Sequence, residues 1–182
     1  MKTTLSLLLA LAALPLLAGQ LADFNSGLGR VLLAGKPGFE DGFECSFQED
    51  AIAPAPGKVL RVALSTPKQK PHARFDVSVM ISPEEAAAVK ALAFDVRADK
   101  PAAVSWVSLY FFPAKRVKVH MIAPSGTWRG AKPNEWKHVE IPVSAFKVLG
   151  GEMKIEDARQ VCLSFFCNAP VELEFANIRL IE

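Results

Sequence analysis

The sequence predicts an all-β fold, a two-sheet β-sandwich with one short helix. Short stretches in which apolar and polar residues alternate follow one another along the chain, as in strands with one buried face. Glycine and proline separate these stretches, and no helical periodicity appears in the last third of the chain. With 182 residues, 51% of them hydrophobic, the chain has the size of one domain with its own core. We therefore expect roughly eight to ten short strands in two packed sheets.

The expected strands can be followed by their apolar faces. A short strand and a glycine turn come first, after Gln20. The apolar faces that follow are Phe43, Cys45 and Phe47; residues 59–64; Phe75, Val77 and Val79; and Leu92, Phe94 and Val96. The longest strand covers residues 103–112, and the next covers residues 117–122. If Val107 and Leu109 face the core, Trp106 and Tyr110 face outward, whereas a register shift of one residue would bury them.

One helix is expected between two of these strands. Ser82 suits the N-cap, Pro83 the first helical position, and Glu85 the third, where its side chain can bond back to the cap. The helix is expected to cover residues 84–89, which is about two turns.

The last third of the chain ends in strands alone. Val139 and Ile141 alternate with polar neighbours, and Pro142 cannot donate a sheet hydrogen bond, so this strand is expected to lie at an edge or to end there. Two more strands carry their apolar faces on Val161, Leu163 and Phe165 and on Val171, Leu173 and Phe175.

Two motifs in this region resemble those of galactose-binding-like jelly rolls. The first is W-x-x-V-x-I-P-x-x-x-F from Trp136, and the second is F-x-N-I-R-L from Phe175. The resemblance covers residues 91–182, and the superfamily includes many carbohydrate-binding modules and the complex I intermediate-associated proteins. It implies a jelly-roll sandwich with a carbohydrate (glycan) ligand. The alternative is a structural or assembly role with a protein partner.

The same resemblance bears on metal binding. Relatives often hold a structural calcium between an acidic residue of the first strand and the Asp of a closing D-N-I motif. Here Asp23 stands in the first-strand pattern, but Ala176 stands at the closing position and has no side-chain oxygen. Because calcium takes six to eight oxygen ligands, we expect no metal, and no motif calls for a cofactor.

The first 19 residues are typical of a secretory signal peptide. Lys2 precedes an apolar run over residues 5–17, and small residues follow at Ala18 and Gly19. The run is shorter than the roughly 20 residues that span a bilayer, and Gln20 stands where a lipidated cysteine would be needed. We expect a signal peptide at residues 1–19, one domain at residues 20–182, no membrane insertion, and a secreted or periplasmic protein.

The charge of the chain argues against nucleic acid as a partner. The formal net charge is +2, and it falls by one when Lys2 leaves, whereas nucleic-acid binding needs a concentrated basic face. A small basic cluster, Lys68, Lys70, His72 and Arg74, is expected to be a solvated turn or strand rim.

Three cysteines in a secreted chain cannot all pair. Cys162 and Cys167 lie on one expected strand, roughly 16 Å apart at the rise of a strand, and a disulfide needs Cα atoms within about 7 Å. A Cys45–Cys167 bridge and three buried unpaired thiols are both open at this point.

No catalytic pattern stands out, so the protein is not expected to be an enzyme. The three histidines fall in different elements, and the G-x-S-x-G motif is absent. Glu172 and Glu174 project from one strand roughly 6.5 Å apart, within the about 5–9.5 Å that separates glycosidase carboxylates. Neighbours on one strand do not face each other across a substrate, so a small glycoside-active enzyme is the least favoured hypothesis.

The candidate ligand-binding residues combine aromatic rings with polar groups. Sugar rings stack on aromatic faces while their hydroxyl groups need polar partners. The predicted set is Asp95, Arg97, Trp106, Tyr110, His120 and Trp128. The first five are expected to share the outer face of one sheet, where a glycan would bind without being chemically changed. A lid over the end of the sandwich is the other role open to Trp128.

Overall fold

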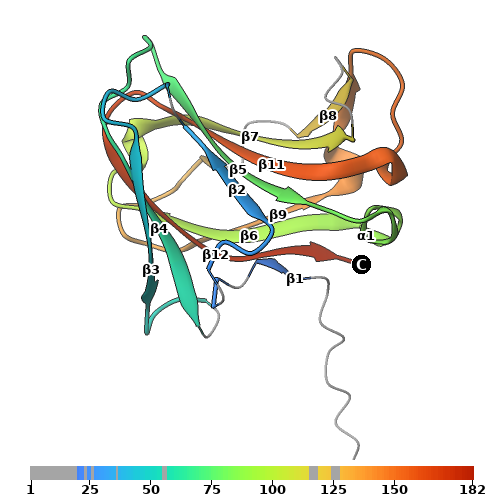
Figure 1. Cartoon of the computed structure of the whole chain (residues 1–182), viewed down its shortest axis with the longest axis horizontal. Coiled ribbons are helices and arrows are strands. Elements are labelled where there is room, and N and C mark those ends of the chain that lie inside the picture. Colours follow the sequence, from blue (N-terminus) through green and yellow to red (C-terminus); the bar gives the residue numbers. More distant parts are fainter. Residues whose placement is uncertain are drawn as a thin grey trace, which may run out of the picture.

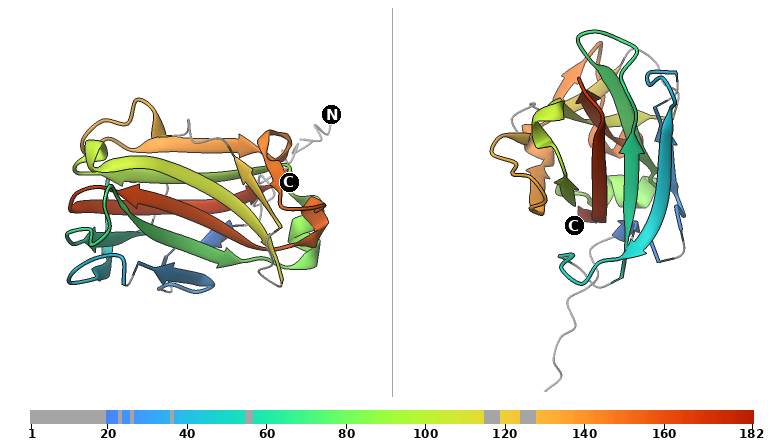
Figure 2. Two further views of the ribbon diagram at one scale, coloured as in Figure 1. Left: turned by 90° about the horizontal axis from the view of Figure 1, so that it is seen from above. Right: turned by 90° about the vertical axis from the view of Figure 1, so that its left-hand side faces the viewer.

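The chain folds into two antiparallel sheets packed face to face. The computed structural model describes residues 20–22, 24–25, 27–35, 37–54, 57–114, 119–123 and 128–182. The layer with β7, β11 and β5 lies over the layer with β6 and β12 (Figure 1), and the strands run along the long axis of the sandwich (Figure 2). The predicted all-β sandwich is therefore confirmed. The predicted signal peptide at residues 1–19 lies outside the described residues.

We call the two layers sheet A and sheet B. Sheet A has the order β3 (Phe43–Glu49), β4 (Lys58–Leu64), β12 (Val171–Ile181), β6 (Ala91–Ala98) and β9 (Lys137–Pro142), with β1 (Gln20–Ala22) paired to the end of β12. Sheet B has the order β10 (Lys147–Leu149), β8 (His120–Ala123), β7 (Val104–Pro113), β11 (Ala158–Cys167), β5 (Ala73–Met80) and β2 (Val31–Ala34). The strands expected from alternation are all present in the described residues, and the extra ones, β2 and β10, are only four and three residues long. Val117 and Lys118, expected in a strand, lie outside the described residues.

The core lies between the sheets and contains the residues that alternation predicted. Val107, Leu109 and Phe111 are at most 1% exposed and face inward from β7, so the register that turns Trp106 and Tyr110 outward is the one adopted. Phe165 of sheet B meets Phe175 of sheet A edge-to-face, with ring centroids 5.2 Å apart. Each fully buried apolar side chain of this size stabilises the fold by about 1.5–3 kcal/mol.

The one α-helix among the described residues, α1 (Pro83–Ala88), carries the predicted cap and lies at the end of the sandwich near the C-terminus (Figure 1). The Ser82 hydroxyl accepts a hydrogen bond from the Glu85 backbone at 3.2 Å, and the Glu85 side chain accepts one from the Ser82 backbone at 2.7 Å. Glu85 also pairs with Arg30 at 2.8 Å, which ties the helix to the turn before β2.

The closing motif forms a bulge. The pairing of β12 with β6 shifts register between Ala176 and Arg179, and Asn177 has a φ of 55°. A bulge leaves an extra residue unpaired in the ladder, and asparagine tolerates the left-handed conformation better than most residues.

The edge position expected for the Pro142 strand is also confirmed, since β9 ends sheet A.

All three cysteines are free thiols. Cys162 and Cys167 are buried in β11, and burial raises the pKa of the Cys167 thiol to about 12. Cys45 is exposed on β3, so neither the bridge to Cys167 nor the burial of all three thiols describes the structure.

Candidate functional site

The predicted ligand residues are divided between the two outer faces of the sandwich and, for Trp128, its end. Asp95 and Arg97 belong to β6 in sheet A, whereas Trp106 and Tyr110 belong to β7 in sheet B, with His120 on β8 beside them. The expectation that these five residues share one face is therefore wrong. The chain crosses from one sheet to the other between β6 and β7, through a 3₁₀ turn at Pro101–Ala103.

On the outer face of sheet A, charged side chains pair with one another. Arg97, whose side chain is 14% exposed, donates to Glu174 through Nε and to Asp50 through Nη2, the latter at 2.6 Å. Its guanidinium also lies 4.8 Å from the centre of the Trp136 ring. The hydrogen bond to Glu174, followed by the charges of Glu174 and Asp50, raises the pKa of Arg97 above its usual value. Arg61 pairs in the same way with Glu172, so both candidate glutamates already have cationic partners.

Asp95 is also satisfied within sheet A. It is 2% exposed, and its carboxylate contacts His138 Nδ1 at 2.7 Å and accepts from Asn177 Nδ2 at 3.1 Å. Arg179 Nη1 lies 3.9 Å away. Within the described residues, no three histidine, cysteine, aspartate or glutamate side chains gather in a way that could hold a metal ion.

Trp128 lies at the end of the sandwich. Its Nε1 donates to the Pro101 carbonyl at 3.0 Å, and its ring meets the edge of Phe165 at 6.0 Å. It also lines an open depression of about 520 Å³ with Pro101 and Pro133. This placement suits the lid role left open for it, since both contacts fasten the ring to the fold.

The outer face of sheet B carries two groups of contacting aromatic rings. We call the two groups together the aromatic ladder; its members are His72, Trp106 and Phe166 in one group and Tyr110, Phe112 and His120 in the other. Trp106 stacks on Phe166 at 4.5 Å between ring centroids, and His72 meets Trp106 edge-to-face at 4.0 Å. Tyr110 stacks on Phe112 at 5.3 Å, and both rings approach His120. The rings are partly exposed, but much of their faces is covered by one another.

Arg74 joins the two parts of the ladder. Its guanidinium carbon lies 5.4 Å from the centre of the Tyr110 ring and 5.9 Å from that of Phe166. From β5 it lies directly beside Phe166 of β11, and it reaches Tyr110 of β7 across the small side chains of β11. Such contacts between a cation and a ring stabilise by about 0.5–1 kcal/mol at exposed sites.

Small polar side chains form the floor beneath Arg74. Cys162 and Ser164 point outward from β11 yet are fully buried, because larger neighbours cover them. The Ser164 hydroxyl donates to Asp76 Oδ1 at 2.6 Å, and Arg74 Nε donates to the same oxygen at 2.6 Å. Burial raises the pKa of the Cys162 thiol, so it stays neutral at physiological pH.

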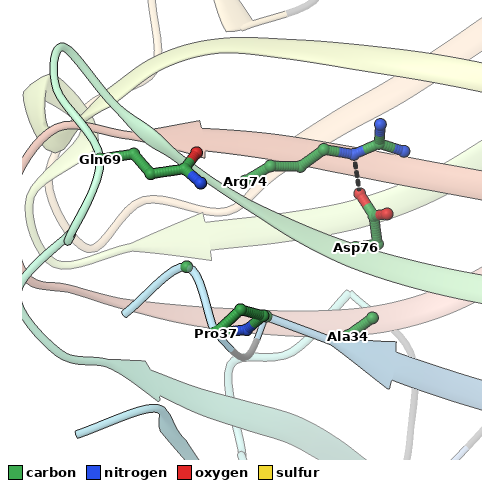
Figure 3. Close-up of a pocket in the computed structure, with 7 residues that line it drawn as sticks. Ala34, Pro37, Gln69, Arg74 and Asp76 are labelled. Carbon is green, nitrogen blue, oxygen red and sulfur yellow. Dashed lines mark hydrogen bonds and ion pairs between the residues drawn. The ribbon is translucent and has the colours of Figure 1, made fainter. Parts of the chain in front are cut away.

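An open depression of about 290 Å³ adjoins this cluster (Figure 3). Arg74 and Asp76 form one side of it, Gln69 comes from the turn before β5, and Ala34, Gly35, Pro37 and Gly38 supply the rest of the described lining. Gly35 is required here, since a Cβ at this position would lie 2.8 Å from the Phe75 ring. The depression therefore combines a guanidinium, a carboxylate and an amide beside the aromatic ladder.

Sequence reasoning missed the residues at the centre of this face. Arg74 was placed in a solvated basic cluster, and Asp76 and Phe166 were not singled out. The signal was present in β5, where Arg74 and Asp76 alternate with the buried Phe75 and Val77. That alternation predicts that both charged side chains project from one outer face.

Solved structures with the same fold bind sugars. The chain is similar to a family 11 carbohydrate-binding module from Clostridium thermocellum in complex with a β-1,3-1,4-mixed-linked tetrasaccharide, with a TM-score of 0.60 and 13% identity over 90% of this chain and 95% of that one. It is also similar to a family 28 module specific for non-crystalline cellulose, with a TM-score of 0.58 and 15% identity over 91% and 94% of the two chains. A family 61 module in complex with β-1,4-galactotriose has a TM-score of 0.53 and 14% identity over 88% and 94%.

These similarities show the fold. The predicted likeness to jelly-roll carbohydrate-binding modules is confirmed at that level. No protein-family model matches the sequence, and no curated protein matches it. In the described part of the chain, no helix is both long and apolar enough to span a bilayer.

Proposed function

We propose that the protein binds a glycan on the outer face of sheet B without catalysing a reaction. The observation that carries the proposal is the combination of the aromatic ladder with Arg74, Asp76 and Gln69 around an open depression. Exposed ring edges and faces offer apolar contact to pyranose C–H groups, and the three polar side chains offer donors and acceptors for hydroxyl groups. Similar modules of known structure bind glycans with the same fold.

The proposal that the protein is not catalytic rests on the placement of the carboxylates. Glu172 and Glu174 lie on one strand and are already paired with Arg61 and Arg97. A glycosidase needs two carboxyl groups that flank the bond to be cleaved. The arrangement on sheet A therefore supports a structural role for this pair.

Binding can be tested with purified protein on an array of polysaccharides and oligosaccharides. We expect retention of a subset of glycans, and loss of that retention in Trp106→Ala. Glu44→Ala, an exposed change on the outer face of sheet A, is the matched control and should bind as the unchanged protein does. Retention that survives Trp106→Ala would contradict the assignment to sheet B, and an empty array would contradict glycan binding itself.

A protein partner is the second candidate function, because exposed apolar residues lie on the same sheet. Leu32 is 57% exposed, Met80 46% and Leu149 46%. Register places Met80 beside Gln160 and Leu149 beside His120, toward the end of the face opposite to Arg74. If Met80→Ser abolishes capture of a protein from the natural source while glycan retention persists, this end of the face has a separate role.

We also propose that residues 1–19 are removed on export and that the mature protein is secreted or periplasmic. The lysine and the apolar run that follows it support this proposal. N-terminal sequencing of the exported protein should begin between Gly19 and Asp23. A mature protein that still begins with Met1 would contradict it.

A further inference from the structure

Two arginines lie against aromatic rings on opposite faces of the sandwich, and only one has its charge fully matched. Arg97 on sheet A has two carboxylate partners, Glu174 and Asp50, and its side chain is 14% exposed. Arg74 on sheet B has one, Asp76, bonded through Nε alone, and its side chain is 40% exposed. Within the described residues, the Nη atoms of Arg74 contact no carboxylate, and Nη2 has only the Cys162 sulfur at 3.9 Å.

Arg74 is nevertheless held in one position. Asp76 fixes its Nε, Ser164 fixes the same carboxylate oxygen from below, and the Tyr110 and Phe166 rings lie against its planar group. A guanidinium that is already ordered loses little side-chain entropy when it binds a ligand. Its two Nη groups form a planar fork whose geometry matches the two oxygens of a carboxylate or a sulfate group.

The surrounding charge favours an anion. Among the described outward-facing residues of the sheet B strands, Asp76 is the only carboxylate, and it is already bonded to Arg74 and Ser164. Lys68 and Lys70 are exposed on either side of Gln69, in the turn that borders the depression. On sheet A, by contrast, Asp95, Glu172 and Glu174 all point outward.

Resting on glycan binding at this face, we propose that the ligand is an anionic glycan and that the Nη groups of Arg74 bind its carboxylate or sulfate group. The acidic sugar lies over the depression beside Gln69, with an adjacent ring against the ladder. Arg74 is thus the residue that selects charged over neutral sugars, and Asp76 is a positioning residue that acts through it.

The test is isothermal titration calorimetry on the full-length protein with matched glycans. One pair is an oligogalacturonate and the same oligosaccharide with its carboxylates reduced to hydroxymethyl groups. The other pair is a sulfated galactan oligosaccharide and its desulfated form. We expect one anionic member to bind, its neutral counterpart to bind at least about 10-fold more weakly, as suits a charge-assisted hydrogen bond, and the difference to shrink as salt is raised. If the oligogalacturonate pair shows the difference, the protein binds a carboxylate; if the galactan pair shows it, the protein binds a sulfate group.

Three variants assign the effect to Arg74. Arg74→Ala should remove the preference for the anionic member, and Arg74→Lys, which keeps the charge but loses the fork, should retain part of it. Arg61→Ala removes an arginine from sheet A and should leave the preference unchanged. Melting temperatures of all three variants show that they are folded.

The possible failures separate the two proposals. Equal binding of neutral and anionic members overturns the selection of charge while leaving glycan binding intact. An anionic preference that survives Arg74→Ala overturns the role of Arg74. Failure to bind any glycan, here and on the array, overturns the proposed function itself.

Discussion

On the outer face of sheet A, Arg61 and Arg97 pair with the two glutamates of β12, and Asp95 contacts His138 and Asn177. On the outer face of sheet B, the ladder rings contact one another, and no carboxylate among the described residues contacts the two Nη atoms of Arg74. Both faces follow the same strand alternation. On sheet A these charged groups are bonded to one another, whereas on sheet B the Nη groups of Arg74 stay exposed and can bind a ligand.

The difference separates stability from recognition within one fold. A charge matched inside the sheet stabilises the protein when it is partly buried, but it has nothing left to offer a ligand. A charge that is exposed and held by a single partner contributes little to stability and can still bind. We therefore expect mutations on sheet A to change stability, and mutations on sheet B to change binding.

The largest effect on stability is expected from Arg97→Ala. The change leaves Glu174 and Asp50, with side chains 9% and 12% exposed, without their cation. Removing one partner from a buried ion pair costs about 3–5 kcal/mol. Urea denaturation measures the loss, and Arg61→Ala is the control, since the 41% exposed Arg61 should contribute less than about 1 kcal/mol. Equal losses from the two variants would contradict the expectation that the buried ion pairs of Arg97 stabilise the fold more than the exposed pair of Arg61.

Trp106→Ala should have an intermediate effect on stability. The ring contacts His72 and Phe166, and each aromatic pair contributes about 0.5–1.5 kcal/mol, so we expect a loss of about 1–3 kcal/mol together with loss of glycan binding. A loss of more than about 3 kcal/mol, as for a buried tryptophan, with no change in binding would mark the ladder as structural.

A smaller, pH-dependent effect is expected at Glu85, which belongs to neither face and serves as a reference. The hydrogen bond from Arg30 is the main cause that lowers the pKa of Glu85 in the folded protein. A lowered folded pKa stabilises the protein fully above the unfolded value of about 4.3, and this contribution is lost as the pH falls through the folded value. Glu85→Gln should therefore be less stable than the unchanged protein at pH 7, by up to about 1 kcal/mol, and the gap should narrow toward pH 3. A gap that is constant with pH would mean that the charge of Glu85 contributes nothing.

The smallest effect is expected from a calcium chelator. Ala176 supplies no side-chain oxygen, and Asp95, which faces it across β12 and β6, is already bonded. The melting temperature should stay unchanged when the chelator is added. A fall of many degrees in the melting temperature would indicate that the fold holds a metal ion and that sheet A has a role in binding it.

The alternation of residues predicted strands and their buried faces well, because the direction of a side chain in a strand depends on its immediate neighbours. Leu92, Phe94 and Val96, for example, all face the core as expected. Alternation carries no information on which sheet a strand joins. The five residues between β6 and β7 carry the chain from one sheet to the other, and this crossing separated Arg97 from Trp106.

The centre of the candidate site could not be found from local pattern for a similar reason. Arg74 and Phe166 are far apart in sequence and become neighbours only because β5 pairs with β11. The contact with Tyr110 then needs β7 on the other side of β11. Long-range pairing of this kind depends on the whole sheet, whereas the helix cap at Ser82 was predicted correctly because all its partners lie within three residues.

The exposed Cys45 makes the protein easy to equip with a reporter group. Maleimide dyes react with accessible thiolates, and Cys162 and Cys167 are buried with raised pKa values. A dye or a surface tether should therefore attach at Cys45 alone. Because Cys45 lies on β3, an edge strand of sheet A, the outer face of sheet B stays open to solution in an immobilised or fluorescent form of the native sequence.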